Sequence, residues 1–195
     1  MTVWPLVVGY VLGSVPFAYV AGRIGRGVDI RRAGSGNVGA TNVLRTAGVW
    51  PAVATTVLDI GKGTAAAWLG FAAGGGPELA VASGAAAVLG HVFPIWLGLR
   101  GGKGVATAFG VFALLAPLAT ALAAGVFVAT VWASRYVSLG SMLGLVALAP
   151  AVWWTTGNGV VTAGSAAVAV LVLLRHRGNV LRLRAGAERH LGDRA

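Results

Sequence analysis

The sequence predicts an all-α polytopic membrane protein, and two observations carry this prediction. Hydrophobic residues make up 57% of the 195 residues and charged residues only 10%, whereas a soluble domain has about 25% charged residues. The apolar residues also lie in long uncharged runs, at 1–22, 79–90, 104–134 and 136–174. About 20 helical residues cross a bilayer core, and a helix satisfies its own backbone hydrogen bonds in lipid. These runs therefore indicate membrane-spanning helices.

The positive charges predict how the helices are oriented. The 15 Lys and Arg residues fall at 23–45, 100–103, Arg135 and 175–194, with Lys62 alone between the first two clusters. Short loops rich in Lys and Arg remain cytoplasmic, because each such charge costs about 2.5–3.5 kcal/mol at the membrane centre. If the clusters share one side, an even number of helices separates each pair of them. The prediction is seven transmembrane helices, with the N-terminus outside and the C-terminus cytoplasmic.

The first three helices follow from two apolar stretches. One helix lies in 1–22, and residues 46–99 hold two spans that turn at GGGPE, 74–78. The tryptophans agree with this orientation, as an aromatic belt requires. Those near outer ends are Trp4, Trp68, Trp153 and Trp154, and those near inner ends are Trp50, Trp96 and Trp132.

The last four helices come in two pairs. Residues 104–134 hold two short helices of about fifteen residues each, with Pro117 near their turn, because one helix there would put Arg135 outside. Residues 136–174 hold two more, which turn at TTGNG, 155–159. In a five-helix alternative, both stretches cross the membrane less completely.

Residues 31–45, RRAGSGNVGATNVLR, contain the G-x-G-x-x-G spacing of a dinucleotide-binding loop, and Asp59 follows about twenty residues later. That fold requires a buried strand before the first glycine and a βαβ unit around it. Here the charged segment DIRRA precedes Gly34, and Asp59 lies in a stretch long enough to cross a bilayer. The context argues against a Rossmann nucleotide site.

The same loop predicts a different kind of phosphate site. Its glycines expose backbone N–H groups that can cradle an anion, and four polar side chains accompany them, Ser35, Asn37, Thr41 and Asn42. A helix is predicted to begin at Thr41, and its N-terminal dipole favours a bound phosphate. Arg45 can close the site as a bidentate clamp. The alternative is a flexible cytoplasmic loop.

A second glycine-rich stretch lies at 91–104. It ends in Gly101, Gly102, Lys103 and Gly104. This is not a Walker A loop, since Leu97 stands at the first glycine position and Gly104 replaces the Ser or Thr after the lysine. Glycine amides beside one fixed ammonium can still bind phosphate, whereas the alternative is an ordinary basic loop. His91, at the start of the stretch, is a packing residue, an interface anchor or a base.

Two further loops carry polar side chains on the predicted cytoplasmic side. Residues 135–141 contribute Arg135, Ser138 and Ser141. An ordinary loop with a Ser helix cap also explains that set. Residues 175–192 contribute His176 and Asn179, which lie three residues apart and so share a helix face. The alternative for this segment is a solvated basic tail that binds anionic lipid head groups.

Asp59 and Lys62 lie in the middle of a predicted span at i, i+3, where they can neutralise each other. Intramembrane charges are candidates for functional sites, but a structural ion pair that fixes helix packing is the favoured interpretation. No set of acids has metal-ligand spacing, and no Ser, His and Asp triad follows from spacing. The sequence therefore predicts no metal and no cofactor.

Six ordered motifs resemble those of the bacterial acyl-phosphate-dependent glycerol-3-phosphate acyltransferases. They are GSVPFAYV (13–20), GSGNVGATNVLR (34–45), LDIGKG (58–63), GHVFPIWLGLRGGKGVAT (90–107), RYVSLGSM (135–142) and HRGNVLRLRAGAE (176–188). The resemblance covers nearly the whole chain, and six motifs in order are far more specific than any one of them. The variation lies around the matching residues, at 61–62 and 185–188.

The resemblance implies a reaction in which acyl phosphate and sn-glycerol 3-phosphate give 1-acylglycerol 3-phosphate (lysophosphatidate) and inorganic phosphate. This is the first acylation of bacterial phospholipid synthesis, and neither acyl-CoA nor acyl carrier protein is the direct donor. The chain is then expected to be a single multi-pass domain, 1–195, in the bacterial cytoplasmic (inner) membrane, with its active site facing the cytoplasm. No obligate protein partner is expected.

The resemblance also implies residue roles. Ser35 and Arg45 are expected to be essential, Gly101, Gly102 and Gly104 to bind glycerol 3-phosphate, His176 and Asn179 to be functional, and Glu188 to support the structure.

The residues give this chemistry a physical basis. Both substrates carry a phosphate, so one site must hold two anions, and Arg45 and Lys103 can offset their repulsion, while the acyl chain belongs in the leaflet. We expect direct attack by the glycerol hydroxyl, with Ser35, Asn37, Lys103 and Ser141 positioning the phosphates and His176 with Asn179 orienting the hydroxyl. The base is His176, His91 or a substrate phosphate oxygen.

A membrane transporter of a phosphorylated solute is the main alternative function. It would also use a basic, glycine-rich site and the Asp59–Lys62 pair. Transporters, however, tend to place their site near the midplane, on broken helices in repeated halves. In this sequence the polar motifs gather at one face, and no internal repeat is found. The acyltransferase is therefore favoured, and a structural scaffold explains the polar loops least well.

Overall fold

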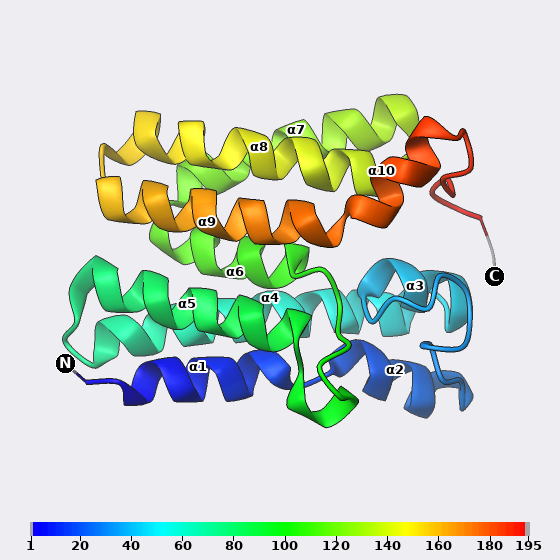
Figure 1. The fold of residues 1–195 in the computed structure, drawn as a ribbon, viewed down its shortest axis with the longest axis horizontal. Coiled ribbons are helices and arrows are strands. Elements are labelled where there is room, and N and C mark those ends of the chain that lie inside the picture. Colours follow the sequence, from blue (N-terminus) through cyan, green and yellow to red (C-terminus); the bar gives the residue numbers. More distant parts are fainter. Residues whose placement is uncertain (1, 194–195) are drawn as a thin grey trace. The chain divides into compact units, whose positions relative to one another are not determined.

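The computed structural model describes residues 2–193, and over that range it contains helices and no strands (Figure 1). The helices are α1 (Trp4–Ser14), α2 (Phe17–Arg26), α3 (Ala40–Thr46), α4 (Val49–Ala72), α5 (Gly76–Val92), the 3-10 turn η1 (Ile95–Leu97), α6 (Val105–Leu115), α7 (Pro117–Ser134), α8 (Val137–Thr156), α9 (Gly159–Arg175) and α10 (Arg177–Arg184). The all-α prediction is confirmed. The chain forms two compact units, one ending at Val111 and the other comprising Phe112–Asp193.

The first unit is built on close packing of α1, α4 and α5. Glycines allow α1 and α5 to lie side by side (Figure 1). A Cβ atom on Gly13 would overlap the backbone of Ala87, and one on Gly90 would overlap the carbonyl of Tyr10. Such small residues let membrane helices approach closely, where lipid supplies no hydrophobic driving force between them.

The first apolar run, expected to be one helix over 1–22, is broken at Val15 and Pro16. Helix α1 ends at Ser14, and α2 begins at Phe17. Pro16 has no backbone N–H, and proline disfavours the helical conformation of the residue before it. Val15 is accordingly extended, at φ −61° and ψ 117°. The break removes the Val15 carbonyl from the α-helical hydrogen-bond pattern, and this carbonyl accepts from the Phe17 N–H at 3.1 Å and from a second donor in α4.

The second unit contains the end of α6 and helices α7, α8, α9 and α10, with α8 packed against both α7 and α9. The predicted turns are confirmed: α7 begins at Pro117, and α8 and α9 are joined at 157–158. Gly157 adopts φ 60°, and Asn158 Oδ1 accepts hydrogen bonds from the N–H groups of Val160 and Val161. Local turn chemistry thus determines where these helices end.

Within the described residues, four segments are long and apolar enough to cross a membrane. They are Trp4–Arg26, Gly76–Leu97, Pro117–Ser134 and Val137–Thr156, and the pair Gly159–Arg175 and Arg177–Arg184, bent by 55°, would make a fifth. Helix α6 is shorter, at 11 residues, and α4 carries Asp59 and Lys62. The seven-span count and the sides of the two termini remain predictions.

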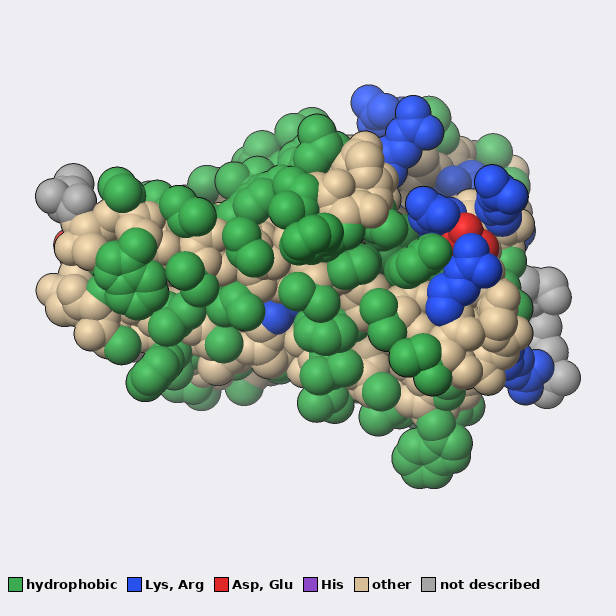
Figure 2. All heavy atoms as spheres, turned by 90° about the horizontal axis from the view of Figure 1, so that it is seen from below, with side chains coloured by type: hydrophobic (Ala, Val, Ile, Leu, Met, Phe, Trp, Pro, Cys, Tyr) green, Lys and Arg blue, Asp and Glu red, His purple; other side chains and the backbone are tan. Residues whose placement is uncertain are grey.

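The surface is that expected of a protein in lipid. Figure 2 shows hydrophobic side chains spread across one face, and most of the Lys and Arg side chains in view gathered toward one end of it. Large apolar side chains are widely exposed, with Trp50 81% and Trp132 88% accessible. Exposed apolar area on this scale marks contact with a membrane or another apolar partner.

Candidate functional site

The loop before α3 is organised by Asn42, a predicted binding residue. Its Oδ1 accepts a hydrogen bond from the Ser35 N–H at 2.9 Å, and its Nδ2 donates to the carbonyls of Ile30 at 2.8 Å and Ala33 at 3.2 Å. The Asn42 side chain is buried, and a Cβ on Gly34 would overlap its Oδ1. Asn42 therefore holds the loop in shape from its centre.

The other predicted side chains of this loop are more accessible. Ser35 is exposed, between Gly34 at φ 61° and Gly36 at φ 70°, and Asn37, Thr41 and Arg45 are partly buried. Both glycines adopt the left-handed conformation, which other residues rarely take up. The predicted helix is confirmed as the short α3, which begins at Ala40. The local turns thus leave Ser35 exposed, while its backbone N–H bonds to the buried Asn42 side chain.

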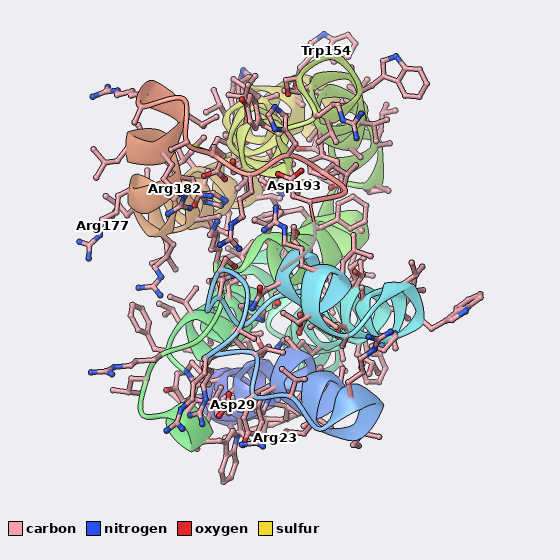
Figure 3. The ribbon with its side chains drawn as sticks, turned by 90° about the vertical axis from the view of Figure 1, so that its right-hand side faces the viewer. Arg23, Asp29, Trp154, Arg177, Arg182 and Asp193 are labelled. Atoms are coloured by element: carbon pink, nitrogen blue, oxygen red, sulfur yellow. The ribbon has the colours of Figure 1, made fainter. Side chains whose placement is uncertain are left out.

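The start of this loop carries a second polar cluster. The Asp29 carboxylate lies 3.3 Å from Arg23 (both labelled in Figure 3) and 2.8 Å from Arg31. Both guanidinium groups lie over the Tyr19 ring. The hydrogen bond from the Arg31 side chain holds the pKa of Asp29 well below its usual range. Asp29 therefore stays ionised and anchors the loop to the end of α2.

The second glycine-rich loop returns to the end of α5. The N–H groups of Gly101 and Gly102 donate to the carbonyls of Val92 and His91, each at 3.1 Å. Those carbonyls are among the last of the helix and have no partner within it. The expectation that these two amides are available to an anion is therefore not met in this structure, because they cap α5. Lys103 is partly buried beside them, and Gly104 adopts φ 91°.

The glycines of this loop are required by close packing. A Cβ on Gly102 would overlap both the His91 ring nitrogen Nε2 and the Val38 carbonyl, and one on Gly101 would overlap the His91 carbonyl and the Pro94 ring. Gly102 thus lies between His91 and the first loop. Two loops that are more than fifty residues apart in the sequence are in direct contact within the first unit.

Beneath these loops lies a buried ionic cluster. Asp59 and Lys62 are 2% and 6% exposed, and Lys62 Nζ lies 2.8 Å from Asp59 Oδ1. The predicted ion pair is present, although Oδ1 receives no well-directed hydrogen bond. His91 Nδ1 lies 3.5 Å from the same oxygen, and Lys62 donates at 3.0 Å to the Val15 carbonyl exposed by the helix break. A small cavity beside Ser14, Phe17 and Val38 borders the cluster.

In the second unit, Glu188 connects the C-terminal segment to the helices. Its Oε1 accepts hydrogen bonds from Ser138 Oγ at 2.7 Å and from Asn179 Nδ2, and its Oε2 accepts from Arg182 Nε at 2.7 Å. Burial raises the pKa of Glu188, but these three donors outweigh it and lower the pKa below its ordinary value. Asn179 is thus engaged with Glu188.

His176 and Ser141 are also buried in this unit. His176 is 1% exposed, and its Nδ1 lies 2.8 Å from the Val172 carbonyl. Because a carbonyl only accepts, Nδ1 carries the proton, and Nε2 is the basic nitrogen of the neutral ring. Ser141 Oγ donates to the Val137 carbonyl one helical turn away, at 2.8 Å. The substrate roles of these residues remain predictions.

Sequence reasoning missed several partners in both units. Val15 and Val38 contribute only backbone carbonyls, which leave no signal in residue type. Arg182 lies among the basic residues of the C-terminal segment, and Tyr136 stacks on His190 of that segment, with ring centroids 4.5 Å apart. The residue types alone do not distinguish these contacts from a solvated basic tail. Within residues 2–193, no group of three or more His, Asp or Glu side chains is arranged to hold a metal.

Comparison with known proteins gives a consistent family. A family model described as glycerol-3-phosphate acyltransferase matches residues 3–186. A glycerol-3-phosphate acyltransferase of Synechococcus sp. (strain CC9902) is 42% identical over 97% of this chain and 94% of its own. That of Sinorhizobium medicae (strain WSM419) is 44% identical over 97% of this chain and 92% of its own.

The fold agrees as well. Crystal structures of PlsY, an integral membrane glycerol 3-phosphate acyltransferase, are 34% identical and cover 97% of this chain and 95% of theirs. The glycerol 3-phosphate form has a TM-score of 0.93 and the lysophosphatidic acid form a TM-score of 0.91. The family model, the relatives and the fold all point the same way, and this all-helical integral membrane protein belongs to the glycerol-3-phosphate acyltransferase family.

Proposed function

We propose that this chain transfers an acyl group from acyl phosphate to glycerol 3-phosphate. The glycerol hydroxyl oxygen attacks the acyl carbonyl carbon and forms the ester, and the bond from that carbon to the phosphate oxygen breaks. The products are lysophosphatidate and inorganic phosphate, and the hydroxyl proton passes to a base. One of the two PlsY crystal structures is a glycerol 3-phosphate form and the other a lysophosphatidic acid form. These two compounds are a substrate and a product of the proposed reaction.

The contact between the two glycine-rich loops is the observation that carries the proposal. Gly102 contacts Val38, so the loop with Ser35 and Arg45 and the loop with Lys103 meet within the first unit. Two cationic side chains and a surface hydroxyl suit a pair of phosphates, which would otherwise repel each other. Acyl phosphate already has a good leaving group, so this chemistry needs no metal or cofactor.

The remaining roles follow from the residues of each unit. In the first, Ser35, Asn37, Thr41, Arg45 and Lys103 bind the phosphates, and Asn42 shapes their loop. In the second, Ser141 positions a phosphate, and His176 with Asn179 orients the attacking hydroxyl. The base is His176, through Nε2, or His91, or a substrate phosphate oxygen, and the hydrogen bond at Nδ1 gives His176 the required tautomer.

The membrane arrangement belongs to the same proposal. The chain spans the bacterial inner membrane seven times, with the N-terminus outside and both the C-terminus and the active site on the cytoplasmic side. Reporter fusions after Pro117 and after Asn158 test this topology. Both reporters are expected outside, and a cytoplasmic signal at either position contradicts the seven-span count.

The activity is tested with purified protein in detergent, labelled glycerol 3-phosphate and palmitoyl phosphate. Labelled lysophosphatidate is expected with this donor and not with palmitoyl-CoA. A transporter of phosphorylated solutes would give no product in detergent and would accumulate label only in sealed vesicles.

Variants then test the site. Ser35→Ala and Arg45→Ala are expected to abolish turnover, whereas the exposed Arg26→Ala serves as the matched arginine control. Near-wild-type turnover by Ser35→Ala would show that the first loop is not the site. An acyl group trapped on Ser35 would replace direct attack by a covalent mechanism.

A further inference from the structure

We propose that His91 is a positioning residue, which sets the glycine loop at 101–104 against the first loop. The inference rests on the proposed function, because it assumes that this loop binds glycerol 3-phosphate. His91 lies in the last turn of α5 and is 8% exposed. It therefore sits at the point where the helix ends and the loop returns to it.

The imidazole ring forms one wall of the space that Gly102 occupies. Even a Cβ on Gly102 would overlap His91 Nε2, and the Val38 carbonyl lies close to the same position. The His91 carbonyl in turn accepts the Gly102 N–H at 3.1 Å. Gly102 is thus fixed through both the ring and the backbone of one residue, so the orientation of that ring determines where the loop lies.

The orientation of the ring is determined from the opposite edge. Nδ1 faces Asp59 Oδ1 at 3.5 Å, and Asp59 is held by Lys62 at 2.8 Å. Lys62 also bonds to the Val15 carbonyl at the break between α1 and α2. Segments from α1, α4 and α5 are therefore linked through His91 to both glycine-rich loops.

This geometry favours support over proton transfer as the role of His91. One ring nitrogen faces a carboxylate, and the other is packed against the Gly102 backbone. A group enclosed in this way acts on the substrate through the loop that it supports. Misplacing a binding loop by about 1 Å can cost a large factor in rate or affinity.

Two amide variants separate the two edges of the ring. In His91→Asn the amide reaches the position of Nδ1 and stops short of Gly102, whereas in His91→Gln it extends to the position of Nε2. We expect His91→Asn to raise the KM for glycerol 3-phosphate about tenfold, with kcat and the KM for palmitoyl phosphate changed less than about twofold. We expect His91→Gln to restore the KM to within about threefold of wild type.

Direct titration of glycerol 3-phosphate into the purified protein supplies a readout besides turnover. The Kd is expected to follow the same order, wild type and His91→Gln below His91→Asn. The exposed His190→Gln is the matched control, and thermal unfolding verifies that each variant is folded.

Each alternative result overturns the inference. A fall in kcat of about a hundredfold in both variants would assign His91 as the general base. An unchanged KM and Kd in His91→Asn, or a raised KM in His91→Gln equal to that of His91→Asn, would show that contact with Gly102 does not set the loop. If the wild-type protein itself forms no lysophosphatidate, the proposed function fails instead.

Discussion

Asp59 in the first unit and Glu188 in the second are both buried carboxylates, 2% and 9% exposed, yet their surroundings differ. Asp59 faces the buried Lys62 and the His91 ring, and its Oδ1 accepts no well-directed hydrogen bond. Glu188 accepts three hydrogen bonds, two of them from the neutral side chains of Ser138 and Asn179. One carboxylate is balanced mainly by charge, the other mainly by directed donors.

The difference predicts which partners each unit can lose. A buried charge whose counter-ion is removed is strongly destabilising, because water cannot replace the lost partner. A carboxylate with several donors shares its stabilisation among them, and an exposed cation contributes little. Lys62, with a side chain 4% exposed, is therefore expected to matter far more than Arg182, with a side chain 47% exposed.

The largest effect is expected for Lys62→Met. This change keeps most of the side-chain volume but leaves Asp59 buried without its ammonium partner, which should reduce the free energy of unfolding by about 3–5 kcal/mol. Thermal or denaturant unfolding in detergent measures the loss. The double variant Asp59→Asn, Lys62→Met should recover most of it, and a single-variant loss below about 1 kcal/mol would contradict the charge-balance account.

A smaller loss is expected for Glu188→Ala. Ser138 and Asn179, each less than a tenth exposed, then lose their acceptor, which should cost about 2–3 kcal/mol in unfolding free energy. Glu188→Gln keeps one acceptor oxygen and the side-chain shape, so it is the matched comparison and should lose less. Equal losses in the two variants would show that the charge, and not the directed donors, stabilises this site.

Much of the fold could be predicted because it depends on local features of the sequence. Pro117 and the Gly157–Asn158 turn mark helix boundaries through their own backbone chemistry, and the structure confirms both positions. The break at Pro16 was not predicted, although proline supplies a local reason for it. The hydrogen bond from Lys62 to the Val15 carbonyl at this break joins residues 47 positions apart, so no local pattern indicates it.

The candidate site also combines predictable and unpredictable features. The composition of each glycine-rich loop indicated where the loop lies, but it did not indicate which acceptors its backbone N–H groups bond to. Glycine spacing suggested free N–H groups at Gly101 and Gly102, whereas these groups cap the end of α5. The contact of Gly102 with Val38 and the His91 ring depends on how the two loops pack against the end of α5, and no residue type in either loop indicates it. The functional roles of the individual side chains remain predictions.

The charge of Glu188 can also be tested by pH. Because its pKa is lowered in the folded protein, the carboxylate contributes stability that is fully present above its ordinary value of 4.5. This stability is lost as the pH falls below that value through the lowered pKa. After a discount for solvent screening, the unfolding free energy of wild type should exceed that of Glu188→Gln by about 1 kcal/mol at pH 7. This difference should disappear under acid conditions. A gap that does not vary with pH would mean that ionisation of Glu188 does not contribute.

The smallest effect is expected for Arg182→Met, the counterpart of Lys62→Met. Arg182 Nε donates to Glu188 Oε2 at 2.7 Å, but its side chain is 47% exposed, so water can replace much of the bond and salt screens the rest. The loss of unfolding free energy should be under about 0.5 kcal/mol and should shrink further at high salt. Measured beside Lys62→Met under the same conditions, it tests the comparison directly. Similar losses in the two variants would mean that exposure of the cation does not decide its contribution, and that the two carboxylates are held in the same way.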